Sequence, residues 1–505
     1  MPINVSGAGL ANSLVFGIGS HLKMAEQLIS GTKIIDADDF SKYKVAVNSM
    51  TIVPTSTLLE PNVIPTTIEQ FEGVPGPLSI TGNFVIDALP LRQELFFRQL
   101  LNAPSLDGIT EVTAGSAGSH TGTGTAQTLL SNGTLTAPDS LDTDIDVNQG
   151  PVQLEITLDT GATYDGTNPP TAANPIQLAI AGTDYRGQTF SETVSLTTIG
   201  TAVETAGYFM TVTSLTPVTA AATGTYDVEA TADRKAIEIK STPGYRITPG
   251  MTMEIVSGTP AGSPAAGGTV NTVSDAYINT FEFSATREEI ITYTFGVTGK
   301  LFEPNVNPAG GSLPFADSAR TSGAGGPYGG GPFETLQDDN TPYAGYSALL
   351  RADNGSTPAI FNQVTGMSLT FDNNTQFTDR LGSIYPGVVY NRQRTGNLEL
   401  TLEYHSSDTD FARAYLEADE WTDVELSLIS SGGVGSFPTN ETRFLFPKVQ
   451  LSEYPSTPIE SDDFVRQTIR GTILPTGGSD TDAIRVWTYG GTNHTEANLF
   501  LLDLS

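Results

Sequence analysis

Short segments in which apolar and polar residues alternate recur along this chain of 505 residues. Alternation with a period of two is the pattern of a β-strand that buries one face. The 52 glycines and 31 prolines separate these segments and supply the turns between them. We therefore expect a mainly β protein, and the pattern excludes a protein built from long helices.

The length predicts about three domains, at roughly 150 residues each. In the first, residues 1–105, strands are expected within Tyr43–Val53 and at Ile80–Ile86. A helix should follow them, because Pro90 suits a first helical position and the next apolar residues have helical spacing. Those apolar residues are Leu91, Leu95, Phe96, Leu100 and Leu101.

The second domain is expected at residues 106–280. Its first part, to about Gln149, is rich in Gly, Ser, Thr, Ala and Asp and predicts a linker or a loop-rich rim. Alternation then returns in short segments separated by turns, which favours a β-sandwich, and an Ig-like one. We expect this insertion to fold alone and to project outward. Its expected strands are Val152–Leu158, Ile176–Ile180, Thr193–Leu196, Phe209–Leu215 and Ile237–Ile239.

The third part, residues 281–505, is predicted to be a further antiparallel β domain. A long loop should interrupt it at the glycine-rich tract Ser322–Pro332. Its expected strands are Ile290–Phe295, Met367–Phe371, Leu398–Leu402, Val424–Leu428, Phe444–Leu451 and Phe464–Leu474.

One short motif occurs in both halves of the chain. Thr81-Gly-Asn-Phe-Val-Ile86 precedes the first helix, and Thr395-Gly-Asn-Leu-Glu-Leu400 precedes a second apolar stripe with a capping box at Ser407 and Asp410. The echo favours two copies of one architecture in equivalent places, and coincidental strand–helix units of an α+β protein are the alternative. The residues expected to carry this fold and its assembly are Gly82, Phe84, Ile86, Leu95, Phe96, Leu100, Gly396, Leu398, Leu400, Phe411 and Tyr415.

The chain is strongly acidic. It has 56 Asp and Glu against 24 Lys and Arg, which gives a net charge of −32. Electrostatic capture of nucleic acid needs clustered Lys and Arg, so this composition excludes broad binding of DNA or RNA.

No residue pattern in the sequence points to catalysis, a cofactor or a metal. Cysteine is absent, the four histidines are scattered, and neither Gly-x-Ser-x-Gly nor His-Glu-x-x-His occurs. Asp142–Asn148 begins like a calcium loop, but Val147 stands where the turn glycine belongs and Gln153 where the bidentate glutamate belongs. We expect a solvated acidic loop there, a solvated strand end at Glu288-Glu289, and a protein that is not an enzyme.

The start of the chain lacks the basic segment of a secretory signal. No apolar run approaches the ~20 residues of a membrane helix. We expect synthesis in a cytoplasm and no membrane insertion.

Several segments resemble parts of one family, the major tail tube proteins of long-tailed bacteriophages and related viruses. Thr365–Asn374, Tyr390–Leu402 and Phe446–Leu451 resemble its C-terminal half, and Gly76–Ile86 with the helix after it resembles its first half. The segment Ile180–Val194, together with Tyr208–Ser214, is similar to Ig-like modules of phage structural proteins. The resemblance implies two tail-tube-type domains, β-sandwich or barrel-forming, with short flanking helices, plus an inserted Ig-like β-sandwich.

This resemblance also implies a function. Subunits would stack as rings into a hollow tail tube, around a tape-measure protein and between tail terminator and baseplate or tip proteins. The chain would be made in the host cytoplasm and reside in the virion tail, and viral DNA would pass through the lumen without specific binding. Two tube domains per chain would let a trimeric, pseudo-hexameric ring form, and a ring of six chains is the alternative. Edge pairing between subunits could close an inner barrel, whose acidic wall would let DNA slide.

Two other classes share parts of this composition. A secreted or surface adhesin, or an S-layer-like protein, would share the Thr, Gly and Ig-like character but normally needs an export signal. A carbohydrate-active enzyme built from β modules needs a catalytic arrangement that the sequence does not show.

Overall fold

The computed structural model confirms a mainly β protein, with one α-helix among the residues that it describes. The expected helix near Phe411, the loop Ser322–Pro332 and Pro90 lie outside these residues. The described residues are 21–27, 43–45, 47–59, 74–89, 93–103, 109–113, 127–143, 145, 152–184, 186–230, 235–241, 249–257, 269–305, 334–335, 342–353, 359–360, 364–403, 420–429, 440–451, 466–475 and 482–490.

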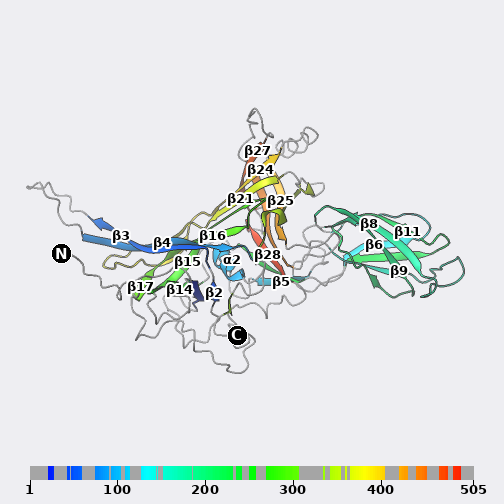
Figure 1. The fold of residues 1–505 in the computed structure, drawn as a ribbon, viewed down its shortest axis with the longest axis horizontal. Helices are drawn as coiled ribbons and strands as arrows, with labels where there is room; N and C mark the ends of the chain where they lie inside the picture. Colours follow the sequence, from blue (N-terminus) through cyan, green and yellow to red (C-terminus); the bar gives the residue numbers. More distant parts are fainter. Residues whose placement is uncertain are drawn as a thin grey trace, which may run out of the picture.

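The described residues form two units with separate hydrophobic clusters. The larger unit draws its cluster from both ends of the chain, from Leu22 to Ala103 and again from Ile239 to Val486. The smaller unit, which we name the inserted sandwich, comprises the described residues of 127–230. In Figure 1 the inserted sandwich is the separate group of strands at the right.

The strands of the larger unit are joined into one extended sheet, and all their pairings are antiparallel except the short contact between β18 and β2. These strands are β1 (His21–Glu26), β2 (Tyr43–Val45), β3 (Ser49–Leu59), β4 (Val74–Asp87), β5 (Ile109–Thr113), β13 (Lys235–Lys240), β14 (Met251–Ser257), β15 (Thr269–Thr286), β16 (Thr292–Gly299), β17 (Leu301–Asn305), β18 (Glu334–Thr335), β19 (Ala348–Asp353), β20 (Ala359–Ile360), β21 (Val364–Asp372), β24 (Thr395–Glu403), β25 (Glu420–Ile429), β26 (Asn440–Leu451), β27 (Arg466–Leu474) and β28 (Arg485–Gly490). A small separate hairpin consists of β22 (Thr375–Phe377) and β23 (Val389–Asn391), and a single 3₁₀ turn, η4, spans Gly345–Ser347.

The inserted sandwich has two sheets, in the orders β10-β7-β12-β6 and β11-β8-β9. Buried and less buried residues alternate along β7, β8 and β12, as the sequence pattern predicts. The Ig-like character of this unit stays a prediction. Its strands are β6 (Gln127–Thr134), β7 (Leu154–Leu158), β8 (Ile176–Thr183), β9 (Thr189–Leu196), β10 (Val203–Glu204), β11 (Thr211–Pro217) and β12 (Thr225–Ala230).

This division differs from the domain boundaries expected at 106 and 280. β13, β14 and β15 pair with strands of the larger unit, and so does β5. Both β5 and β6 also lie in the stretch that we expected to be a linker. These strands stand among Gly, Ser and Thr, so few large apolar side chains mark them in the sequence.

The larger unit contains the same four-stranded arrangement twice. We name β3–β4–β16–β15 the first module and β21–β24–β27–β26 the second, each in the order of hydrogen-bonded neighbours. In both modules the chain forms the first and second strands, then the fourth, and finally the third. Every neighbouring pair is antiparallel, so matching strands of the two modules run in the same direction.

The strands around the modules correspond as well. β14 pairs with β15 as β25 pairs with β26, and β1 pairs with β14 as β19 pairs with β25. The pairings β1–β2 and β15–β17 are repeated as β19–β20 and β26–β28. The Thr-Gly-Asn motif lies on the second strand of each module, β4 and β24. The two copies are not separate domains, however, because β15 pairs with β21 and one hydrophobic cluster spans both.

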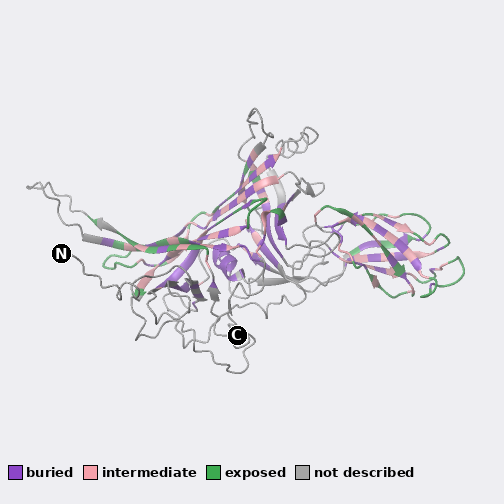
Figure 2. Ribbon diagram, in the orientation of Figure 1, coloured by how far each residue is buried: buried purple, intermediate pink, exposed green. Residues whose placement is uncertain are grey.

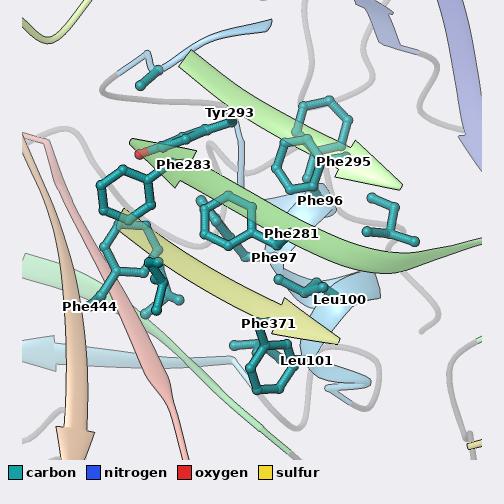
Figure 3. Packing of buried hydrophobic residues seen from close by; sticks show 14 of the residues in the cluster. Phe96, Phe97, Leu100, Leu101, Phe281, Phe283, Tyr293, Phe295, Phe371 and Phe444 are labelled. Carbon is teal, nitrogen blue, oxygen red and sulfur yellow. The ribbon is translucent and has the colours of Figure 1, made fainter. Parts of the chain in front are cut away.

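An aromatic core under the sheet joins the two modules through the helix α2 (Glu94–Leu101). Phe97 of α2 lies with its ring centroid 5.6 Å from Phe281 of the first module and 5.5 Å from Phe444 of the second. Phe84 and Phe295 stack beside them with ring centroids 5.4 Å apart. Figure 3 shows how the rings of Phe97, Phe281, Phe295 and Phe444 meet. A helix of eight residues is marginal by itself in water, so its stability depends on this packing.

The pairing of β5 with β13 gives a direct test of the inserted sandwich. Thr113 and Lys235 are register partners, so replacing residues 114–234 by Asn-Gly should close a two-residue hairpin. We expect this variant to stay soluble and to unfold cooperatively, as measured by circular dichroism during heating. Removing residues 106–280 should abolish soluble protein, because β13, β14 and most of β15 are lost with them. Equal behaviour of the two deletions would contradict the boundaries described above.

Candidate assembly interface

One face of the sheet that the two modules form is polar, and the other packs on the core. Along β4, Phe84 and Ile86 are buried whereas Thr81 and Asn83 are exposed. The same alternation crosses the neighbouring strands, where Figure 2 shows it as bands of different burial. The hydroxyl and amide side chains on this polar face include Thr51, Thr55, Ser79, Thr81, Asn83, Thr280, Ser284, Thr294, Thr298, Ser368, Thr370, Thr395, Asn397 and Thr472.

A shallow groove of about 690 Å³ lies on the polar face. Both Thr-Gly-Asn motifs line it, through Thr81 and Asn83 on β4 and through Thr395 and Asn397 on β24. Motifs that are far apart in the sequence therefore share one continuous surface.

The polar face has a net negative charge. Its described charged side chains are Asp87, Glu282, Asp372, Glu399, Glu403, Lys448 and Arg470. The Arg470 Nε lies 2.9 Å from Glu399 Oε2, and both side chains are about half exposed, so this ion pair contributes little to stability. Five acidic and two basic groups among many hydroxyls make a weakly acidic surface.

The modules meet where β15 pairs with β21. Seven register pairs join Thr280–Thr286 to Gly366–Asp372. On the core side of this junction Phe281 lies opposite Phe371, and both are buried. The polar face and the core therefore continue across the junction without a break.

β3 is the outermost strand of the first module. Among the described strands it pairs only with β4, which leaves one row of its backbone N–H and C=O groups without a described strand beside it. Val53 is exposed on this strand, and Pro54 follows it. An open edge can pair with another chain, and Pro54, which has no N–H to donate, would interrupt such pairing at its own position.

The expected fold and assembly residues that the structure describes are buried, except Gly82, which is partly exposed and lines the groove. The buried ones contribute to the core and do not offer a surface to another copy. The described residues of this set are Gly82, Phe84, Ile86, Leu95, Phe96, Leu100, Gly396, Leu398 and Leu400. Phe411 and Tyr415 lie outside the described residues. The alternating Thr and Ser of the opposite face were visible in the sequence, but nothing in the sequence distinguishes the edge strand β3.

Gly82 and Gly396 are each glycine for a different steric reason. A Cβ on Gly82 would overlap the backbone carbonyl oxygen of Thr51 in β3. A Cβ on Gly396 would approach Cβ of Ile473 to 3.1 Å and Cδ2 of Phe371 to 3.3 Å. Gly82 thus allows two backbones to approach closely, whereas Gly396 makes room for side chains.

A buried ionic cluster lies in the layer around the second module. The Glu425 carboxylate lies between Arg351 and Arg443, with N–O distances of 3.3 Å to each, and Arg443 also binds Glu441 at 2.9 Å. Burial raises the pKa of Glu425, against the opposing effect of the two arginines, and burial lowers the pKa of Arg351. Arg443 also lies 5.7 Å from the ring centroid of Trp487. These charged groups lie on strands β19, β25 and β26, and their burial keeps them inaccessible to a ligand.

The described part of the chain shows no group of three His, Asp or Glu residues that could hold a metal ion. In the acidic loop, Asp142 Oδ2 accepts a hydrogen bond from the Ser131 N–H, while Asp144 and the residues from Asp146 to Asn148 lie outside the described ranges. Glu288 and Glu289 are exposed, as expected for a solvated strand end. No helix among the described residues is long and apolar enough to cross a membrane.

No known family model matches the chain, and no curated protein matches its sequence.

The motif glycines generate a graded prediction for stability. Gly82→Ala should lower the free energy of unfolding by about 1–3 kcal/mol or more, because a carbonyl oxygen must move. Gly396→Ala should cost less, since side chains can shift, and Gly366→Ala is a matched control because no atom lies within 3.8 Å of its added Cβ. Urea denaturation measures all three, and an equal loss in the three variants would contradict this account.

Proposed function

We propose that this protein is the subunit of a viral tail tube, which polymerises as stacked rings around a central passage for DNA. The repeated module carries this proposal. Inside one chain, the fourth strand of the first module already pairs with the first strand of the second. The same type of junction can join the second module of one copy to the first module of the next.

The motif asparagines define which residues correspond. Asn83 is the register partner of Thr51, as Asn397 is of Thr370, so Val53 corresponds to Asp372. β26 corresponds to β15, and β25 covers its edge as far as Gln450. By the same correspondence Gln450 matches Thr280, so the incoming β3 of another copy would pair beyond Gln450, and the described part of β26 ends one residue later at Leu451.

Closure of a ring would pair the open edge of β3 and so remove its exposed backbone groups. Three copies would supply six modules, which is the trimeric, pseudo-hexameric arrangement. Across the first module, Thr51 lies in one row with Asn83, Gly296 and Thr280. Thr280 then pairs with Asp372, which is two residues beyond Thr370, the residue that corresponds to Thr51. A stagger of this kind at each junction tilts the strands, as a closed barrel requires.

The orientation follows from the two faces. With the core turned outward, the polar face would line the passage, and its hydroxyls and net negative charge would let DNA slide without binding it. A tape-measure protein would occupy the same passage before DNA, and tail terminator and baseplate or tip proteins would close the ends. The inserted sandwich would project outward, because it is attached through β5 and β13, and α2 packs against β13 on the core side.

Electron microscopy of the purified protein tests the proposal. We expect stacked rings, each with three copies, because every copy contributes two modules. A photo-crosslinking residue at Val53 should attach to the C-terminal end of β26 in another copy, as identified by mass spectrometry, and denaturing gels should show a ladder that ends at the trimer.

The control places the same residue at Val218, which is equally exposed but lies in the inserted sandwich. We expect no attachment to β26 from that position. Monomers at all concentrations would contradict the tube, and a ladder that extends to six copies would contradict the ring of three.

The charge of the proposed lumen gives a separate prediction. Glu282 is exposed on the polar face, so Glu282→Lys should preserve tubes but slow DNA ejection, and Glu282→Gln should have a smaller effect. The defect should ease at higher salt, because the screening length falls below about 10 Å above 0.1 M. Ejection from phage that carry each variant is measured by fluorescence of released DNA. Unchanged ejection with Glu282→Lys at low salt would show that this side chain does not meet DNA.

A further inference from the structure

Exposed apolar side chains gather at the hairpin β22–β23. Leu381 is fully exposed, and Ile384, Tyr385 and Val388 are also among the few large apolar side chains that the described residues leave in water. Single exposed apolar residues are ordinary, but a cluster of them marks a surface that contacts another molecule.

The hairpin is fixed to the sheet at several points. Asn279 of β15 accepts the Asn373 N–H at its backbone oxygen (2.9 Å) and the Thr375 N–H at its side-chain oxygen (2.6 Å). The Leu78 N–H of β4 donates to the Ile384 carbonyl at 2.9 Å. The apolar side chains are therefore held outward by a defined backbone.

This hairpin is also basic in a strongly acidic chain. Arg380 and Arg392 are exposed on it, and Arg394 lies at its base. Asp379 is the only acidic residue between Thr375 and Arg394. The surface that fits the hairpin is therefore apolar and acidic.

Such a surface lies beyond the C-terminal end of β15, the strand whose Asn279 anchors the hairpin. Past the end of β15, Ile290 is 58% exposed, and Tyr346 of η4 is 68% exposed. The exposed charged side chains beside them are Arg287, Glu288 and Glu289, two acidic groups against one basic group. The Gly345 N–H donates to the Glu289 carbonyl at 2.8 Å, which fixes the turn η4 against this segment. Asn279 lies within β15 and Thr286 ends it, so about 23 Å separates the two residues along the strand at about 3.3 Å per residue.

We infer that the β22–β23 hairpin of one copy docks on the Ile290–Tyr346 end of a second copy in the next ring. The inference rests on the proposed tube and specifies how its rings stack. One end of the sheet presents apolar and basic groups and the other presents apolar and acidic groups. A contact between unlike ends repeats without closing, so it stacks rings in a single direction.

Charge reversal at each end tests this contact. Arg380→Glu with Arg392→Glu should leave rings intact but raise the ring concentration needed for half-maximal stacking at least about tenfold, and so should Glu288→Arg with Glu289→Arg. Combining both pairs of reversals should restore stacking, since the complementary charges are exchanged. Electron microscopy and sedimentation measure the stacks.

The controls separate this contact from folding and from ring formation. Arg380→Lys with Arg392→Lys keeps the charge and should stack normally, and Glu204→Lys changes an exposed charge in the inserted sandwich without affecting stacking. Leu381→Ser alone should also weaken stacking, and its full exposure means that it does not disturb the core. Rings that stack normally in all the variants would overturn the inference and leave the tube intact. A wild-type chain that forms no rings would instead overturn the proposed function.

Discussion

The pairing of β15 with β21 is the interaction on which the arrangement of the larger unit depends. Backbone N–H and C=O groups in a sheet need partners, and this junction satisfies them between two modules that are built alike. It also carries the polar face and the aromatic core from one module into the other. A chain that satisfies one edge in this way leaves the equivalent edge, on β3, without a described partner, and that asymmetry favours assembly with further copies.

The two faces of this sheet impose opposite demands on the sequence. The core face holds aromatic rings that meet across α2, and there a missing or added carbon changes the packing. The polar face uses Thr, Ser and Asn, which suit β-strands and interact with water. Gly82 meets the demand for close packing, because it allows β3 and β4 to approach each other. Thr81 and Asn83, on either side of it, meet the demand for a polar face.

The acidity of the chain is unevenly placed. Residues 127–230 contain 12 Asp and Glu and one basic residue, Arg186, so a large share of the net charge lies in the inserted sandwich. The polar face has five described acidic groups and two basic ones. Net charge therefore describes the outside of the molecule more than the proposed passage, and the passage depends on its hydroxyl groups as much as on its carboxylates.

The sequence by itself determined the mainly β class, most of the strands and the buried face of each, because alternation is a local property of neighbouring residues. It also showed the Thr-Gly-Asn echo and the apolar stripe that became α2. Only the tertiary structure decided that β13, β14 and β15 belong to the larger unit, that both motifs share one sheet, and that β3 lies at its edge. These features depend on pairings between residues far apart in the chain. Strand pairing uses backbone N–H and C=O groups, which are the same in almost every residue, so the sequence does not specify which strands pair. The sequence could not show that Leu381 lies outside both hydrophobic clusters, because the identity of an apolar residue does not tell whether neighbouring residues bury it.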